Sequence, residues 1–397
     1  MNAEHARPLE GVTVVSLEQA IAAPYATRHL ADLGARIIKV ERPHGGDFAR
    51  AYDGRVRGLS SHFVWVNRSK ESLTLDLKHE LARGVLERLL SKADVLVQNL
   101  APGAAARLGL SADALRPKHP RLILCDISGY GYDGPYRDRK AYDLLVQCEA
   151  GFLSVTGTPE TQVKAGISVA DIAAGMYAYS GILSALIARG RTGVGSRVEV
   201  SMLEALAEWM GFPLYYAFAG ADAPPRTGAS HATVYPYGPF PTGDGATIMV
   251  GLQNEREWTI FCRDVLGTPE LERDERFDTN ARRSANREAL HAIIIAEFAS
   301  RTADEVAQRL DAAGIANARI RDMHGLWEHP QLRARDRWRP VETPAGAVPQ
   351  LLPPASTDAY EARMDPIPAL GQHTDAILAE LGMNDAEIRA LHAARAV

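Results

Sequence analysis

A single aspartate stands at the start of a predicted helix that is rich in small and apolar residues. Residues 163–170 read VKAGISVA and look extended, and Asp171 begins a helical stretch that runs to Arg189. The first N–H groups of a helix lack intrahelical partners and form its positive dipole end, so this position can meet an anionic substrate. An ionised carboxylate there can also act as a nucleophile that briefly accepts an acyl group.

The same aspartate has a structural explanation. Ser168 and Asp171 fit the S-x-x-D/E capping pattern, and aspartate is favoured in the first turn of any helix. Judged on residues 168–171 alone, capping is the better interpretation. A catalytic role therefore needs support from the rest of the chain.

Basic residues recur in and around the loops that follow predicted strands. Cations that converge at one edge of a sheet can hold a polyanion such as a phosphorylated nucleotide, although each alone is typical of a solvated surface. The segment 136–143, YRDRKAYD, is the densest cluster because it mixes basic and aromatic groups. The pattern predicts an α/β enzyme with an anionic ligand, for which a nucleotide-tailed thioester is one candidate. The basic residues are Arg42, Arg68, Lys70, Lys78, Arg107, Arg137, Arg139 and Lys140.

The sequence lacks the motifs of several other classes of enzyme. The turn after the first predicted strand, residues 18–24, contains no glycine, which argues against a nicotinamide dehydrogenase with G-x-G-x-x-G. The sequence also has no phosphate-binding P-loop, no H-E-x-x-H and no G-x-S-x-G. Cys125, Cys148 and Cys262 are too far apart in sequence for a CxxC site, so we predict neither a disulfide framework nor a bound metal.

Strands and helices alternate in the first half of the chain. Strands are expected at 12–17, 36–41, 72–77, 94–100 and 121–128, with helices at 24–33 and 80–91. This order predicts an α/β fold with a mainly parallel, Rossmann-like sheet whose ligand loops follow the strands. We expect residues 1–200 to form the first part of a large domain, 201–224 a linker, 225–325 a smaller α+β domain, and 326–397 a linker and a return to the large domain.

Bulk composition limits the possible partners. The 397 residues carry a net charge of −5 and are 46% hydrophobic, which is ordinary for a globular protein and does not favour nucleic-acid binding. No signal peptide is visible at the N-terminus, and the most apolar stretch near 182–187 is too short to span a membrane. We therefore expect a cytoplasmic protein with neither nucleic acid nor membrane as a partner.

The chain resembles the class III CoA-transferases, the group that includes formyl-CoA transferase and carnitine CoA-transferase. The resemblance covers nearly the whole length and depends on the order of short strings. These are LEGVTVVSL (9–17), LGARIIKVER (33–42), NRSK (67–70), LDLK (75–78), ADVLVQNLAPG (93–103), KAYD (140–143), GFLSVTG (151–157), GISVAD (166–171) and GQHTD (371–375).

The resemblance implies that Asp171 is the nucleophile. It would form a mixed anhydride with the donor acyl group and then an aspartyl-CoA thioester, which the acceptor acid attacks. Helix N–H groups near Asp171 could stabilise the oxyanions, and the helix dipole would hold its carboxylate ionised. The resemblance also implies an interlocked homodimer, with acyl-CoA and a carboxylic acid as substrates and no permanently bound cofactor. It places CoA against Arg42, Leu75, Lys78, Asn99, Leu100, Ala101, Arg107, Arg139, Lys140 and Tyr142.

Departures from the family pattern bear on the reaction. The run of glycines that closes the formyl-CoA transferase site has no counterpart, and Ile21 stands where the oxalate enzyme has a polar residue. The related α-methylacyl-CoA racemases usually carry a His-Asp pair where this chain has Tyr142 and Asp143, so a general acid/base is missing. Transfer is favoured, while α-methylacyl-CoA racemase-like isomerisation and formyl-CoA:oxalate transfer stay as alternatives.

The acceptor acid is expected to be a small dicarboxylate. The loop 226–238 looks like that of dicarboxylate-using relatives, and Arg226 or His231 could bind the distal carboxylate; a plain turn is the alternative. Gln19, Ile21 and Asp143 are the other candidate substrate contacts. Succinyl-CoA is the expected donor, with itaconate, mesaconate or citramalate as acceptor.

Overall fold

The computed structural model describes residues 6–397, which form two compact units. The first unit contains the residues up to 150 together with 165–211 and 332–397, and the second contains 151–164 and 212–331. The sequence pattern had assigned 151–164 to the large domain. In the structure this segment pairs within the second unit, where the Gly228 N–H donates to the Gly157 carbonyl (2.7 Å).

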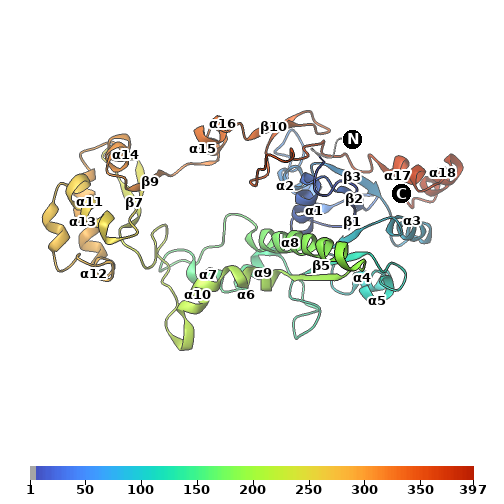
Figure 1. Ribbon diagram of the computed structural model, residues 1–397, viewed down its shortest axis with the longest axis horizontal. Helices are drawn as coiled ribbons and strands as arrows, with labels where there is room; N and C mark the ends of the chain where they lie inside the picture. Colours follow the sequence, from blue (N-terminus) through green and yellow to red (C-terminus); the bar gives the residue numbers. More distant parts are fainter. Residues whose placement is uncertain (1–5) are drawn as a thin grey trace. The chain divides into compact units, whose positions relative to one another are not determined.

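A six-stranded parallel sheet lies at the centre of the first unit (Figure 1). Its order is β3-β2-β1-β4-β5-β6, so the direction of strand addition reverses between β1 and β4. Ligands of such sheets bind beyond the carboxyl ends of the strands at this reversal. The α/β prediction is confirmed. The strands are β1 (Thr13–Leu17), β2 (Arg36–Glu41), β3 (Lys70–Thr74), β4 (Val95–Gln98), β5 (Ile123–Ser128) and β6 (Arg197–Ser201).

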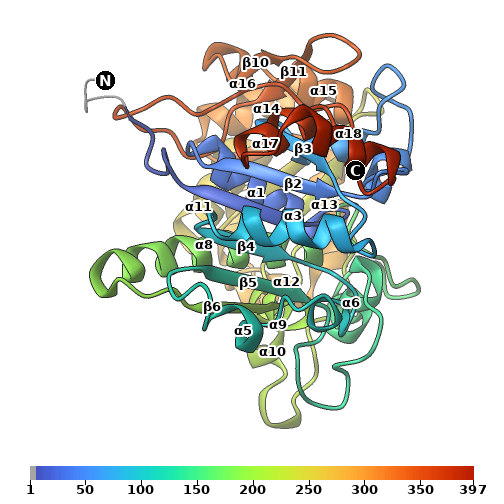
Figure 2. The same ribbon diagram turned by 90° about the vertical axis from the view of Figure 1, so that its right-hand side faces the viewer.

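One face of this sheet is covered by helices α3 (Glu80–Leu90), α5 (Ala112–Leu115), α17 (Thr374–Glu380) and α18 (Asp385–Ala393) (Figures 1 and 2). Helix α3 places apolar side chains on one side at helical spacing, and these pack on side chains of β1, β2 and β4. The C-terminal helices complete the same core through Ile377 and Leu378.

The other face carries α1 (Ala22–Asp32) and α8 (Val169–Thr192), which pack against each other. At 24 residues, α8 is long and apolar enough to cross a membrane by length and composition. It also contacts β5, β6 and α9, and it buries Ala173, Gly175, Ala178 and Ile182. These contacts leave 39% of its apolar 18-residue window buried.

The expected linkers contain regular structure. Residues 201–224 include α9 (Met202–Trp209), α10 (Gly211–Tyr216) and the 3₁₀ turn η3 (Phe218–Gly220). In 326–350, β10 (Trp338–Val341) pairs antiparallel with β11 (Val348–Leu351). Val341 and Val348 of this hairpin pack against α2. The remaining elements of this unit are η2 (Phe48–Ala51), α2 (Ser61–Val66), α4 (Ala104–Arg107) and α6 (Asp143–Glu149).

The second unit is built on a three-stranded antiparallel sheet in the order β7-β8-β9. Its core contains the buried aromatic side chains of Phe240, Trp258, Phe261, Phe277 and Phe298. The elements are α7 (Phe152–Val155), β7 (Tyr237–Pro241), β8 (Thr247–Gly251), α11 (Glu255–Ile260), the π-helical η4 (Phe261–Leu266), η5 (Pro269–Arg273), α12 (Asn280–Ala285), α13 (Arg287–Phe298), α14 (Ala303–Ala312), β9 (Ala316–Arg319) and α15 (Met323–Trp327). Helix α16 (Pro330–Ala334) joins the two units in sequence.

Candidate active site

Asp171 is the third residue of α8. Residues 163–168, which look extended in the sequence, belong to no strand in the structure, and α8 already begins at Val169. The local capping prediction is wrong, because the Ser168 side chain makes no capping hydrogen bond. The helix start therefore needs another partner for its free N–H groups.

Asp143 on α6 is that partner. One carboxylate oxygen, Oδ1, accepts the N–H of Ala170 (2.8 Å) and that of Asp171 (3.3 Å). The other, Oδ2, accepts the side-chain amide of Gln147 (2.6 Å). The N–H groups expected to stabilise a substrate oxyanion are thus already bonded to a second carboxylate.

The two carboxylates determine the electrostatics of the site. Burial and, second, the negative charge of Asp143 raise the pKa of Asp171 to about 7, against a hydrogen bond from the Ala22 backbone that lowers it. Burial and the charge of Asp143 therefore oppose the stabilisation of the ionised form that was expected from the helix dipole. A carboxylate of raised pKa is a stronger base and nucleophile than an exposed one, and it is substantially ionised near neutral pH.

The Ala22 N–H belongs to the first residue of α1, and the loop that leads into it from β1, residues 18–21, is tightly held. Asn99, just after β4, accepts the Gln19 N–H (2.8 Å) and donates its amide to the Gln19 carbonyl (2.8 Å). Gln19 in turn accepts the Phe48 N–H through Oε1 (3.3 Å), and Ile21 is buried. The loops on either side of the strand reversal are thereby joined.

Gly175 lets α8 approach this loop. It lies one turn beyond Asp171, and a Cβ added there would be 2.7 Å from the Ala22 carbonyl oxygen and 3.0 Å from the Tyr25 ring. Real Cβ atoms do not come so close to backbone. A glycine at 175 is thus required for α1 and α8 to bring the Ala22 N–H to Asp171.

Sequence reasoning missed Ala22, Gly175 and Tyr52. Burial, followed by the charges of Asp47 and Asp171, raises the pKa of Tyr52 to about 12, so its hydroxyl is protonated at neutral pH. Tyr52 sits in the irregular Pro/Gly stretch 43–58, where residue types alone gave no signal. The small-residue pattern of α8 was the available signal for Gly175.

The predicted CoA-binding residues follow strands β2 to β5 of the first unit. Arg42 is exposed and donates to the Gly46 carbonyl (2.9 Å), and the Arg139 guanidinium stacks over Tyr136 (3.6 Å). The Leu75 side chain is buried, so a ligand could contact only the backbone of this residue. The roles of these residues stay predictions. The other members are Lys78, Ala101, Arg107, Lys140 and Tyr142, all exposed, and Asn99 and Leu100, both half-buried.

Two basic residues counted among the possible anion contacts are not on that edge. Arg68 is buried and makes a bidentate pair with Asp32 (2.8 Å for each bond). Lys70 is buried beside Glu18 (2.7 Å). Both side chains form buried ion pairs, so neither is available to bind a polyanion.

Arg226 and His231 have partners within the second unit. The Arg226 guanidinium donates to the carbonyls of Thr158 (2.9 Å), Pro159 (2.8 Å) and Ser154 (3.3 Å). The His231 ring accepts two backbone N–H groups at Nδ1 and stacks on Tyr237. Both shape their own loop; the prediction that either binds a distal carboxylate stays a prediction.

Comparison with known proteins places these features in a wider group. The family model described as CoA-transferase family III matches residues 9–374. The chain is 33% identical to a succinate–glutarate CoA-transferase of Agrobacterium fabrum over 94% of this chain and 96% of that protein. It is 31% identical to a succinyl-CoA–D-citramalate CoA-transferase of Chloroflexus aurantiacus over 98% of both. A crystal structure of a CAIB/BAIF family protein from Brucella suis superposes with a TM-score of 0.84 at 32% identity, covering 95% of this chain and all of that one.

Proposed function

The chain belongs to CoA-transferase family III and is a CoA-transferase, and from this premise we propose that it moves CoA from succinyl-CoA to a small dicarboxylate through Asp171. Itaconate, mesaconate and citramalate are the acceptors we propose. The names of the two relatives, which pair succinate or succinyl-CoA with glutarate or D-citramalate, support a dicarboxylate acceptor.

The observation that carries the role of Asp171 is its setting. A half-buried carboxylate lies at a helix start, beside a second carboxylate and against one N–H donor. Its raised pKa makes it a stronger nucleophile toward a thioester carbonyl than an ordinary carboxylate. A carboxylate needed only as a cap would not be paired with another carboxylate that already caps the same helix.

The proposed reaction proceeds through activated carboxyl groups. Asp171 attacks the succinyl thioester carbonyl; the C–S bond breaks, and a mixed anhydride and CoA thiolate form. The thiolate attacks the aspartyl carbonyl of the anhydride, which releases succinate and leaves an aspartyl-CoA thioester. The acceptor carboxylate attacks that thioester and again releases thiolate. The thiolate then takes the acceptor acyl group and restores Asp171.

The Ala22 N–H has a defined part in this sequence. When the thiolate or the acceptor attacks the aspartyl carbonyl, negative charge develops on an oxygen of Asp171 itself. A fixed N–H donor at that oxygen stabilises the charge, and removal of one such donor typically costs about 10²–10³ in rate. The Ala170 and Asp171 N–H groups, held by Asp143, have no such part.

The test of this proposal is a covalent adduct. After incubation with succinyl-CoA, mass spectrometry should find an acyl or CoA adduct on Asp171 that hydroxylamine removes. Asp171→Ala should abolish both adduct and transfer, whereas Asp358→Ala, which removes an exposed aspartate, should leave both intact. Full transfer activity in Asp171→Ala, or solvent deuterium at the substrate α-carbon without any acceptor acid, would contradict the proposal.

We further propose that the enzyme is an interlocked homodimer. In support, α9 and α10 expose large apolar side chains, among them Trp209, Phe212, Leu214 and Tyr215. Exposed apolar groups of this size commonly mark protein interfaces. Light scattering after gel filtration should give twice the chain mass of 43.1 kDa; a monomer would refute this.

A further inference from the structure

Four buried charges lie at the loop that leads from β1 into Ala22, the first residue of α1. Glu18, Lys39, Asp47 and Lys70 all have fully buried side chains. The Lys39 ammonium contacts Asp47 (2.7 Å) and Glu18 (3.3 Å), and Lys70 contacts Glu18 (2.7 Å). Removing charges from water is costly, and apolar side chains could fill the same space at lower cost. The proposed reaction uses none of these groups.

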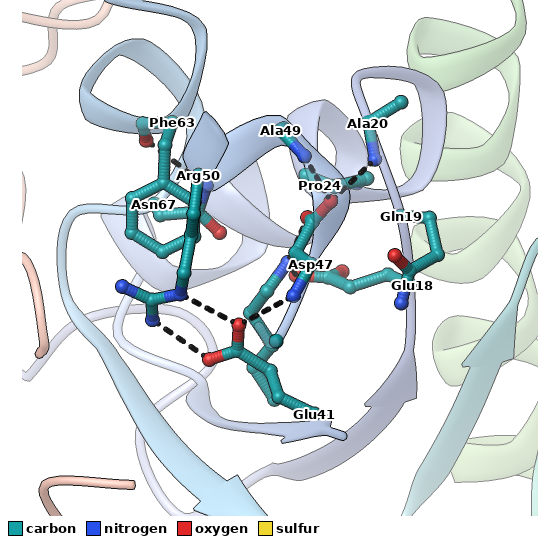
Figure 3. Close-up of polar contacts among 12 residues, drawn as sticks. Glu18, Gln19, Ala20, Pro24, Glu41, Asp47, Ala49, Arg50, Phe63 and Asn67 are labelled. Carbon is teal, nitrogen blue, oxygen red and sulfur yellow. Dashed lines mark hydrogen bonds and ion pairs between the residues drawn. The ribbon is translucent and has the colours of Figure 1, made fainter. Parts of the chain in front are cut away.

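Asp47 links the cluster to the loop. Its Oδ2 accepts Lys39, while its Oδ1 accepts the N–H of Ala20 (3.0 Å) and of Ala49 (2.9 Å) (Figure 3). Ala20 has φ of 60°, the left-handed region that alanine rarely adopts. Such a conformation persists where the surroundings impose it, and Asp47 supplies the bond at that residue.

Asp47 is itself fixed to the sheet. Glu41, the last residue of β2, accepts the Asp47 N–H (3.0 Å) and two donors of Arg50 (2.8 Å each) (Figure 3). Ser72 on β3 donates to the same carboxylate (2.6 Å). The sheet thereby determines the position of Asp47, and Asp47 determines that of Ala20.

The first turns of α1, beyond Ala22, are held by the same cluster. Lys70 donates to the Pro24 carbonyl (2.9 Å), and Thr27 of α1 donates to Glu18 (2.6 Å). The Ala22 N–H lies between Ala20 and Pro24, so its place is set from both sides. A loop that only had to connect β1 to α1 would not need this support.

We propose that Asp47 is a positioning residue for catalysis: by holding Ala20 it fixes the loop so that the Ala22 N–H points at the Asp171 carboxylate. This inference rests on the proposed role of Asp171. A displacement of about 1 Å at a reacting group can cost about 10²-fold in rate. The buried cluster is therefore expected to act on the rate of the aspartyl steps as well as on stability.

The test compares two double variants of equal charge. Lys39→Met with Asp47→Asn removes one charge of each sign and leaves an amide oxygen to accept the Ala20 N–H. Lys39→Met with Asp47→Ala removes the same charges and that acceptor. In rapid-quench mass spectrometry with succinyl-CoA, the first variant should form the Asp171 adduct within about threefold of wild type, and the second at least about tenfold more slowly.

A pH profile separates positioning from general destabilisation. Because the Ala22 N–H favours the ionised form of Asp171, its loss should move the acid limb of adduct formation to higher pH in the alanine variant only. Asp143 from α6 bonds the same helix start, and Tyr52 interacts electrostatically with Asp171; both variants retain these two titratable groups. Asp32→Asn breaks an equally buried ion pair at the other end of α1, and it should lower stability without shifting the acid limb.

Equal adduct rates and equal pH profiles in the two double variants would overturn the inference while leaving the Asp171 adduct, and so the proposed function, in place. If the alanine variant fails to fold, Gly175→Ala tests the same N–H from the α8 side without changing any charge. Its Cβ must displace the Ala22 backbone, so adduct formation at the wild-type rate in Gly175→Ala would also overturn the inference.

Discussion

Replacing Asp143 with asparagine should lower the pKa of Asp171 and make the enzyme faster at acid pH. The change removes the negative charge that lies against the start of α8 and leaves an amide oxygen that can still accept the N–H groups of Ala170 and Asp171. Burial, the larger cause of the raised pKa, is retained. The pKa of Asp171 should therefore fall from about 7 but stay above the ordinary value of 3.8.

The size of the effect follows from the same numbers. A rise from 3.8 to about 7 is about three pH units, or roughly 4 kcal/mol of cost for ionising Asp171 in the folded protein. A neighbouring like charge typically accounts for about one unit or more of such a rise. At about pH 5, well below both pKa values, a drop of one unit increases the ionised fraction about tenfold. Above pH 8 the rate should be unchanged or lower, because a less basic carboxylate is a weaker nucleophile.

Stability should change in the same variant with a definite sign. Because the folded-state pKa of Asp171 lies above its unfolded value, the unfolded chain releases this proton first as the pH rises. Stability is thus lost between about pH 4 and pH 7. Asp143→Asn should reduce that loss, which urea denaturation at pH 5 and pH 8 can measure.

The assay is single-turnover formation of the Asp171 adduct from pH 4.5 to 9. Asp358→Asn makes the same charge change at an exposed residue and should leave the midpoint in place. Gln147→Leu removes the hydrogen bond to Asp143 without changing charge and should move the midpoint far less than Asp143→Asn. A midpoint for Asp143→Asn at or above that of wild type would refute the electrostatic account of the site.

Three further predictions concern other parts of the first unit. Asn99→Leu removes the two hydrogen bonds from the Asn99 side chain to the N–H and the carbonyl of Gln19. Adduct formation should slow, and the free energy of unfolding should fall by about 1–3 kcal/mol. Wild-type kinetics in this variant would argue against a role for the Asn99–Gln19 hydrogen bonds. Burial and the charges of Arg28 and Arg68 lower the pKa of His29 to about 3. Below about pH 6.5 the unfolded chain therefore binds a proton at His29 that the native state does not, and this destabilises the fold. In urea denaturation, His29→Gln should raise the free energy of unfolding by up to about 2–3 kcal/mol at pH 4.5 and leave it unchanged at pH 8. Gly195→Ala would place a Cβ 2.1 Å from the Leu122 carbonyl oxygen and should destabilise the fold by about 1–3 kcal/mol in thermal denaturation, whereas Gly84→Ala on α3 has open space and should be stabilising.

Much of the fold was predictable because it depends on local pattern. The apolar runs at 36–41 and 121–128 became β2 and β5, and the helical spacing of 80–91 became α3. The alternation of strands and helices was enough to predict a parallel sheet, since parallel neighbours need crossover connections. The glycine-free first turn and the ordered family strings then separated a CoA-transferase from a dehydrogenase.

The candidate site was predictable only in part. Asp171 and Asp143 were both singled out from the sequence, but not their relation. The sequence suggested that Ser168 caps α8, whereas the structure uses Asp143, 27 residues before Ala170. Arg68 and Lys70 looked like ligand contacts because a basic side chain reads the same in sequence whether it is solvated or buried with a carboxylate.

The sequence by itself was enough to predict the order of most elements of the first unit and the class of enzyme, and it singled out Asp171 as the candidate reactive carboxylate. Only the tertiary structure decided the state of that carboxylate, because burial, the charge of Asp143 and the Ala22 N–H come from three segments far apart in the chain. Residue patterns report local conformational preference and the face that each element buries. The pKa of a side chain depends instead on which distant groups the packing of α1, α6 and α8 brings within a few ångströms.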